Sequence, residues 1–282
     1  MPDPNLQKDL QKRLELANVI AKSAGQLTLN YFQTDRLDVT RKGDGTPLTI
    51  ADQEAEKFLR QAIQDAYPDD AIVGEEYGET AGQGSKESEY TWILDPIDGT
   101  KSFISGVPLY GTMVAVEKAT EENSARGSVI GSIYFPGLDD GIYASQGQGA
   151  WSFQGDAAPT AASVSKTSSL ADSVMVTSQV ETFGDRQAEE VYQQLAQAVY
   201  FSRTWGDAYG YYLVATGKVE VMINPILDIW DAAAVQPIVQ EAGGRFTDWA
   251  GSSRIDAGES IGTNGLVHDE VITFTKKLAG AF

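Results

Sequence analysis

Apolar residues near the start of the chain recur at the three- and four-residue spacing of a helix, with charged residues between them. These positions are Leu6, Leu10, Leu14, Ala17, Ala21 and Ala24. The pattern predicts a long amphipathic helix whose apolar stripe faces the core. A polar loop is predicted over residues 33–48, followed by a second helix in which Thr49 and Asp52 form a capping box. The predicted buried face of that helix consists of Ala55, Phe58, Leu59, Ala62 and Ile63.

The middle of the chain predicts strands, because stretches rich in Val, Ile and Tyr alternate with Gly and Pro breaks. These strands are predicted over residues 110–117, 127–135 and 141–145. Residues 155–172 are rich in Ala, Ser, Thr and Pro, and we place the junction between two domains there, with residues 1–160 before it and residues 161–282 after it. The second part is predicted to alternate between strands at 174–178, 219–223 and 245–247 and helices at 186–198, 206–216, from Asp231 and at 267–279. Such alternation favours an α/β half with a sheet covered on both faces.

The most informative segment for chemistry is residues 92–103. An apolar run ends at Asp95, Asp98 follows three residues later, and Gly99 and Thr100 come next. A buried strand is expected to deliver both carboxylates to its end and then turn into a helix whose free N–H groups suit a phosphate. Carboxylates would repel a phosphate unless hard cations such as Mg²⁺ lay between them, so the segment predicts a metal-assisted phosphate site. A simple Asp-rich turn is the alternative that this segment alone leaves open.

Two other segments carry carboxylates after or before apolar runs. Glu75 and Glu76 follow the apolar residues 71–73, and Asp231 opens an apolar stretch that ends at the glycine pair 243–244. Taken separately, the glutamates also fit solvated loop charges. Asp231 also fits a first-turn acid favoured by the helix dipole.

Composition narrows the classes of function. The 282 residues include 21 Lys and Arg against 40 Asp and Glu, for a formal charge of −19, so nucleic acid and anionic membranes are not expected partners. The chain has no cysteine, which excludes a thiolate nucleophile and thiolate zinc sites. Its single histidine, His268, is expected in a loop entering the last helix. Carboxylates and a metal are left to do the chemistry. The polar first residues and the lack of a long apolar run predict a cytoplasmic protein.

Taken together, these segments resemble the inositol monophosphatase family of Mg²⁺-dependent phosphomonoesterases. The resemblance is carried by Asp95-Pro-Ile-Asp-Gly-Thr100, by Trp230-Asp231 with Glu241-Ala-Gly-Gly244, by Glu75-Glu76 and by Asp44-Gly-Thr-Pro-Leu-Thr-Ile-Ala-Asp52. These motifs stand in the family's order. The resemblance implies an α/β and α+β fold, a layered α-β-α-β-α sandwich, with the active site between the two halves.

The resemblance also implies two or three Mg²⁺ ions per site and a set of ligands for them. Glu75, Asp95 and the carbonyl of Ile97 would hold one ion. Asp95, Asp98 and Asp231 would hold a second, and Glu75 would share a third through water.

The same family pattern implies roles around the phosphate. Thr100 would orient the attacking water together with Asp52, and Glu75 would complete the catalytic group. The backbone N–H groups of Gly99 and Thr100 would bind the phosphate.

Substrate choice depends on residues 203–212, which open a helix in the second half. Their pattern Trp-Gly-Asp-x-Tyr-Gly-Tyr resembles the histidinol-phosphate phosphatase branch, whereas inositol-type members usually have a small neutral residue in place of Asp207. Histidinol phosphate carries an ammonium and a titratable imidazole, with which a carboxylate can pair. Asn224 stands where inositol-type members commonly carry Glu. We therefore predict that Arg203, Asp207 and Asn224 bind the substrate, although Asp207 also fits a first-turn helix acid.

The predicted function is hydrolysis of the small phosphate monoester L-histidinol phosphate to L-histidinol and phosphate, a step of histidine biosynthesis. Inositol-1-monophosphatase and 3′-phosphoadenosine nucleotide phosphatase are the enzyme alternatives. The non-enzyme alternative is a phospholigand-binding relative, which should have lost at least one site residue. None is lost among Glu75, Asp95, Asp98, Thr100 and Asp231. A homodimer is left open.

Overall fold

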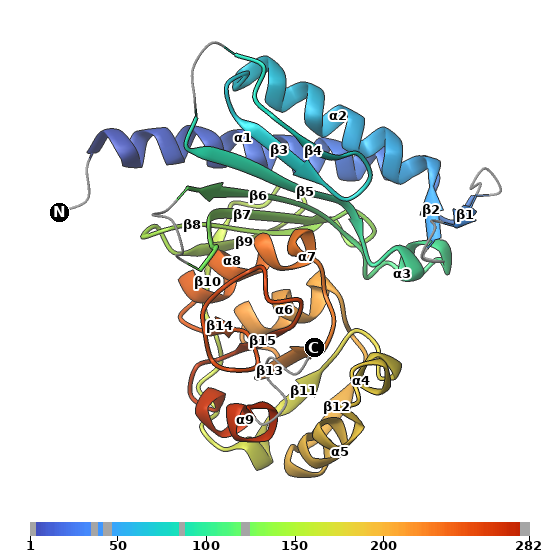
Figure 1. Ribbon diagram of the computed structural model, residues 1–282, viewed down its shortest axis with the longest axis vertical. Coiled ribbons are helices and arrows are strands. Elements are labelled where there is room, and N and C mark those ends of the chain that lie inside the picture. The colour runs from blue at the N-terminus through green and yellow to red at the C-terminus, as the bar shows by residue number, and fades with distance from the viewer. Residues whose placement is uncertain (1–3, 35–38, 42–46, 85–87, 120–124, 277–282) are drawn as a thin grey trace.

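The computed structural model describes residues 4–34, 39–41, 47–84, 88–119 and 125–276 of the chain. Helices and sheets alternate in five layers, α-β-α-β-α, stacked along the longest axis of the molecule (Figure 1). This arrangement confirms the layered sandwich that the family resemblance implies. No helix among the described residues is both long and apolar enough to cross a membrane.

The outer layer at one end consists of α1 (Pro4–Thr28) and α2 (Ile50–Ala66), which cover one face of the large sheet (Figure 1). The predicted stripe of α1 is buried from Leu10 onward. The predicted face of α2 is wrong at Phe58, which is 37% exposed. Since a helix turns by about 100° per residue, Phe58 is carried away from the line of Ala55 and Leu59. That line is shared instead by buried polar residues: Asp52, Glu56 and Arg60.

The predicted capping box at the start of α2 is present. Thr49 is the N-cap and accepts the backbone N–H of Asp52, while the Asp52 side chain accepts the N–H of Thr49. The predicted loop over residues 33–48 is wrong in part, because it contains the antiparallel pair β1 (Val39–Arg41) and β2 (Pro47–Thr49). Residues 35–38 and 42–46 of that loop lie outside the described residues.

The large sheet has the strand order β10-β9-β8-β7-β6-β5-β3-β4, with only β3 and β5 parallel among its pairs of described strands. Its strands are β3 (Ala71–Gly74), β4 (Gly78–Thr80), β5 (Tyr90–Asp98), β6 (Gly111–Lys118), β7 (Ser128–Phe135), β8 (Asp140–Ser145), β9 (Ala150–Gln154) and β10 (Thr160–Ala162). Successive residues of β6 alternate between two cores, with Val114 and Val116 packed under α1 and α2, and Met113 and Ala115 packed on the other face. Both faces are covered, which explains the nearly continuous apolar runs of these strands.

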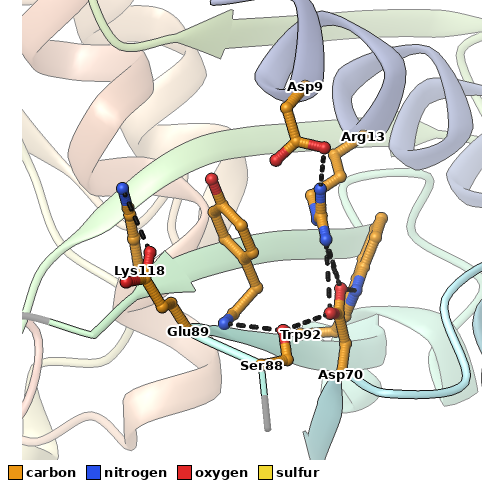
Figure 2. Close-up of polar contacts among 8 residues, drawn as sticks. Asp9, Arg13, Asp70, Ser88, Glu89, Trp92 and Lys118 are labelled. Carbon is orange, nitrogen blue, oxygen red and sulfur yellow. Dashed lines mark hydrogen bonds and ion pairs between the residues drawn. The ribbon is translucent and has the colours of Figure 1, made fainter. Parts of the chain in front are cut away.

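A buried polar cluster connects α1 to the starts of β3 and β5 in this sheet. Figure 2 shows Arg13 of α1 reaching Asp70, which also accepts hydrogen bonds from Ser88 and from the indole N–H of Trp92. The guanidinium of Arg13 lies between two tyrosine rings, 3.9 Å from the ring centre of Tyr90. Burying this charge is tolerated because it is paired and hydrogen-bonded.

The remaining elements form the middle layer, the second sheet and the last layer. The middle layer contains α6 (Ala208–Ala215), α7 (Ile229–Ala233) and α8 (Val235–Glu241). The second sheet has the order β12-β11-β13-β15-β14, from β11 (Val174–Val176), β12 (Phe201–Arg203), β13 (Val221–Asn224), β14 (Arg245–Thr247) and β15 (Ser260–Thr263). Its other face is covered by α4 (Glu181–Asp185), α5 (Glu189–Ala198) and α9 (His268–Thr275). A short 3₁₀ helix, Leu170–Asp172, precedes β11 in the chain.

Three predicted helix boundaries in this second half are wrong. The helix predicted over residues 186–198 begins only at Glu189, as α5, and the short helix α4 (Glu181–Asp185) before it was not predicted. The helix predicted to start at Asp231 begins at Ile229, with Asp228 as its N-cap and Asp231 at the third position of a second capping box. The last helix is shorter than predicted, and residues 277–279 lie outside the described residues.

The apolar core between the two sheets joins both halves of the chain. Ile133 of β7, Val239 of α8 and Met222 of β13 belong to one buried cluster. The domain boundary expected between residues 160 and 161 stays a prediction.

Candidate active site

A pocket of about 280 Å³ lies where the end of β5 meets the starts of α3 (Thr100–Ile104), α6 and α7. These elements belong to both halves of the chain. Six carboxylates and one lysine line the pocket among the described residues: Glu75, Asp95, Asp98, Asp207, Asp228, Asp231 and Lys101. Such an excess of negative charge in a small space favours cations.

Three of these carboxylates lie close enough together to share a cation. One ligand oxygen from each of Asp95, Asp98 and Asp231 lies within 4.8 Å of the others. A break in the β5–β6 register between Asp95 and Asp98 brings two carboxylates of one strand to the same site. The bulge is stabilised by the hydroxyl of Thr112, which donates to the Pro96 carbonyl at 2.8 Å. Irregular pairing of this kind commonly redirects side chains beside active sites.

Four aspartates of the site make the same kind of hydrogen bond, in which one carboxylate oxygen accepts a bond from a backbone N–H. The pairs are Thr49 N with Asp52 Oδ2 at 2.8 Å, Ile97 N with Asp95 Oδ1 at 3.0 Å, Ala208 N with Asp98 Oδ2 at 2.6 Å, and Asp228 N with Asp231 Oδ2 at 2.8 Å. Each bond fixes the orientation of its carboxylate before any ligand binds. The second oxygen of each group can then serve a cation or a water without loss of this bond.

Burial and mutual repulsion raise the pKa values of the cluster. Burial raises the pKa of Asp95, and the charges of Glu75 and Asp98 raise it further. Burial likewise raises the pKa of Asp98, followed by the charge of Asp207. Burial raises the pKa of Asp231 to about 8. A divalent cation would remove this repulsion, and hard carboxylate oxygens are the ligands that Mg²⁺ prefers, so the donor set fits the metal.

Asp52 lies behind this cluster rather than on the pocket wall. Its side chain is fully buried, and burial raises its pKa to about 6. The Oδ1 atom has no hydrogen-bond partner among the described residues, while Oδ2 is held by Thr49. A buried carboxylate oxygen without a partner is costly, so this atom is suited to accept a bond from a water or a substrate group.

The start of α3 lies against Asp207. Gly99 is the N-cap of α3 with φ of 79°, a left-handed conformation that favours glycine. A Cβ atom there would lie 2.9 Å from Oδ2 of Asp207, so a side chain would also collide with the pocket wall. Thr100 is the first helical residue, and its hydroxyl donates to the carbonyl of Ile97 at 3.1 Å. The first N–H groups of a helix lack partners within it and suit an anion.

The structure brings two of the three predicted substrate residues to the pocket. Asp207 lines the pocket with φ of 54°, and its N–H donates to Ser178 Oγ at 2.9 Å. Burial raises its pKa, while the hydrogen bond from Ser178 and the charge of Lys101 lower it. Asn224 lines the pocket too, but its Oδ1 accepts the N–H of Ser178 at 3.1 Å, and its amide donates to Tyr211.

Arg203 is not brought to the pocket. It ends the edge strand β12, its side chain is exposed, and its guanidinium lies 5.1 Å from the ring centre of Phe201. His268 is not in the expected loop, because it opens α9 in the core, where Thr247 and Thr263 contact its two ring nitrogens at 3.1 Å and 2.9 Å.

The pocket also contains residues that the sequence motifs did not single out as functional. Lys101 Nζ donates to Gln179 Oε1 at 2.5 Å, which joins α3 to the segment after β11 across the pocket. Asp228 lines the pocket as the N-cap of α7. Lys101 follows Thr100 in the first motif and could have been found there. Gln179 is 78 residues away from Lys101 and carries no local signal.

Comparison with known proteins agrees with this geometry. The profile of the inositol monophosphatase family matches residues 9–278. A histidinol-phosphatase of Chlorobaculum parvum is 41% identical over 88% of this chain and 90% of its own length. A histidinol-phosphatase of Streptomyces coelicolor is 34% identical over 93% of this chain and 96% of its own length.

Solved structures show the same fold. The suppressor protein SuhB of Bartonella henselae superimposes with a TM-score of 0.82 at 26% identity, covering 94% of this chain and 99% of its own. An IMPase of Thermotoga maritima gives a TM-score of 0.78 at 27% identity, covering 95% of this chain and 98% of its own. We conclude that the chain belongs to the inositol monophosphatase family and is a phosphoric monoester hydrolase.

Proposed function

We propose that this enzyme hydrolyses L-histidinol phosphate to L-histidinol and phosphate with Mg²⁺ as its cofactor. The observation that carries the substrate is Asp207, a carboxylate on the pocket wall beyond the Asp95–Asp98–Asp231 cluster. A phosphate monoester with a cationic group can place its phosphate at the metals and its cation beside this carboxylate. A neutral polyol gains less from such a wall. The histidinol-phosphatase relatives, at 34–41% identity, support the same substrate.

The chain supplies the remaining functions through its own groups. Asp95, Asp98 and Asp231, with Glu75 and the Ile97 carbonyl, would hold two or three Mg²⁺ ions. When bound, the metal neutralises the charge on the phosphoryl group during transfer. The carboxylates are already oriented by their backbone bonds, so little reorganisation is needed on binding.

Asp52 and Thr100 are proposed to orient the attacking water. Asp52 offers its unpartnered Oδ1 atom, and Thr100 offers a hydroxyl held in place by Ile97. The N–H groups of Gly99 and Thr100 at the start of α3 are proposed to bind the phosphate oxygens. The cytoplasmic location, the homodimer and a role for Arg203 stay predictions.

The test is the specificity constant kcat/KM on a panel of substrates in saturating Mg²⁺. The panel consists of histidinol phosphate, inositol 1-phosphate and adenosine 3′,5′-bisphosphate. We expect histidinol phosphate to exceed the other two by about tenfold or more, since one charge-assisted hydrogen bond contributes about 1.5–3 kcal/mol. A preference for inositol 1-phosphate or for the nucleotide would refute the substrate assignment.

A further inference from the structure

Glu56 is a fully buried acid in α2, one helical turn after Asp52. Its carboxylate accepts the backbone N–H of Glu76 at 2.7 Å and that of Tyr77 at 3.2 Å. Arg60, one turn further along the helix, donates from Nε to the same carboxylate at 2.7 Å. The buried carboxylate of Glu56 therefore makes its hydrogen bonds to Arg60 and to one segment of backbone, and not to solvent.

The segment that Glu56 holds is the short loop between β3 and β4, residues 75–77, which carries the candidate ligand Glu75. Strand pairing holds the loop at its start, where the N–H of Glu75 donates to the Leu94 carbonyl at 3.2 Å. Arg60 holds its far end, donating to the carbonyl of Gly78 and to Thr80 Oγ1. Glu56 therefore binds the middle of the loop, and Arg60 binds its end.

Gly74 of β3 packs so closely against Glu56 and Arg60 that no side chain fits at this position. A Cβ atom on Gly74 would lie 2.1 Å from Oε1 of Glu56 and 2.8 Å from Nη2 of Arg60. The absence of a side chain at this position allows the carboxylate to reach the loop. The three residues form one packed unit behind the pocket.

The same helix also carries Asp52. Residues four apart lie on one face of a helix, separated by about 6 Å along its axis. Asp52 and Glu75 are near enough that the charge of Glu75 contributes to the raised pKa of Asp52. One rigid element thus sets where the water-orienting carboxylate lies and where the Glu75 loop lies.

We propose that Glu56, supported by Arg60, is a positioning residue of the metal site, which holds the Glu75 loop against the Asp95–Asp98–Asp231 cluster. This inference rests on the proposed metal-dependent function. Glu56 acts through the backbone of Glu76 and Tyr77, and it does not line the pocket. Groups that orient metal ligands commonly contribute about 10–100-fold to metal affinity.

The experiment is calorimetric titration of Mg²⁺ into metal-stripped protein, using wild type and three variants. Glu56→Gln keeps the shape but presents an amide to donors that need a carboxylate. Gly74→Ala keeps the charge but pushes the carboxylate away. Glu117→Gln is the matched control, because Glu117 is also a buried acid paired with an arginine, Arg126, and it does not line the pocket.

We expect Glu56→Gln and Gly74→Ala to weaken Mg²⁺ binding by about tenfold or more, and the control to stay within about twofold of wild type. The Mg²⁺ concentration for half-maximal phosphate release should rise in parallel, and saturating Mg²⁺ should restore most of the turnover. A loss of turnover with unchanged Mg²⁺ affinity would show a merely structural role and overturn the proposal. Should Glu56→Gln fail to fold by circular dichroism, the Mg²⁺ affinity of Gly74→Ala decides the question. Wild-type protein that binds no Mg²⁺ would instead contradict the proposed function itself.

Discussion

Asp207 offers the sharpest test of substrate recognition, through the substitution Asp207→Asn. The change is isosteric, and it leaves the backbone demand at this position, where φ is 54°, the same for both residues. The bond from the Asp207 N–H to Ser178 Oγ involves the backbone and should survive. The variant therefore removes a charge from the pocket wall with little change in structure.

The magnitude follows from the interaction that is lost. A hydrogen bond to a charged group contributes about 1.5–3 kcal/mol, and about 1.4 kcal/mol corresponds to a tenfold change. We expect kcat/KM for histidinol phosphate to fall by about ten- to a hundredfold. Hydrolysis of glycerol 2-phosphate, which has no cationic group, should change by less than about threefold, since the carboxylate cluster and the N–H groups proposed to bind the phosphate are untouched.

The assay is phosphate release from each substrate under identical Mg²⁺. The matched control is Asp139→Asn, because Asp139 also has a positive φ of 53°, accepts a hydrogen bond from Tyr134 and does not line the pocket. Its kinetics should match wild type on both substrates. Equal losses on both substrates in Asp207→Asn would refute the reasoning, and would assign Asp207 to the support of the α6 start.

Two further changes test the carboxylate cluster and the buried histidine. Asp98→Asn should lower turnover by at least about a hundredfold while circular dichroism stays that of wild type, because it removes the charge of one proposed metal ligand; an unaltered rate would show that the ligand assignment is wrong. Burial lowers the pKa of His268 to about 4, below its ordinary value of 6.5, so the unfolded state binds more protons between these values. The free energy of unfolding, measured in urea, should therefore lose a contribution of up to about 3 kcal/mol as pH falls from about 6.5 to about 4. His268→Asn should lack this contribution, and a pH dependence identical to wild type would contradict it.

Local signals in the sequence predicted much of the fold. Helix α1 and the Val- and Ile-rich strands could be identified because the spacing of their apolar residues shows which side of each element packs against the core. The capping box of Thr49 and Asp52 is likewise local, since both partners lie within one turn. The error at Phe58 arose because apolar character alone does not fix the angle at which a helix meets a sheet. The polar residues Asp52, Glu56 and Arg60 form part of the buried face of α2, which a search for apolar residues alone does not find.

The parts of the site that could not be predicted depend on contacts between distant segments. Glu56 gave no signal, because the loop it binds is 20 residues away in sequence. The bond between Ala208 and Asp98 spans 110 residues and forms only when the two halves pack. Arg203 was expected at the substrate because it is close to Asp207 in sequence. Local sequence does not determine which way the side chains of an edge strand point.

The measurement that tests the central claim most directly is phosphate release from histidinol phosphate by metal-stripped enzyme as Mg²⁺ is added back. The pocket is lined by carboxylates, the chain has no cysteine, and His268 is buried away from the pocket. Neither a cysteine nor the histidine is therefore available in the pocket as a nucleophile. We predict no turnover above background in excess chelator, and a saturable return of activity as free Mg²⁺ rises. Full turnover in excess chelator, after exhaustive removal of metal, would contradict the account.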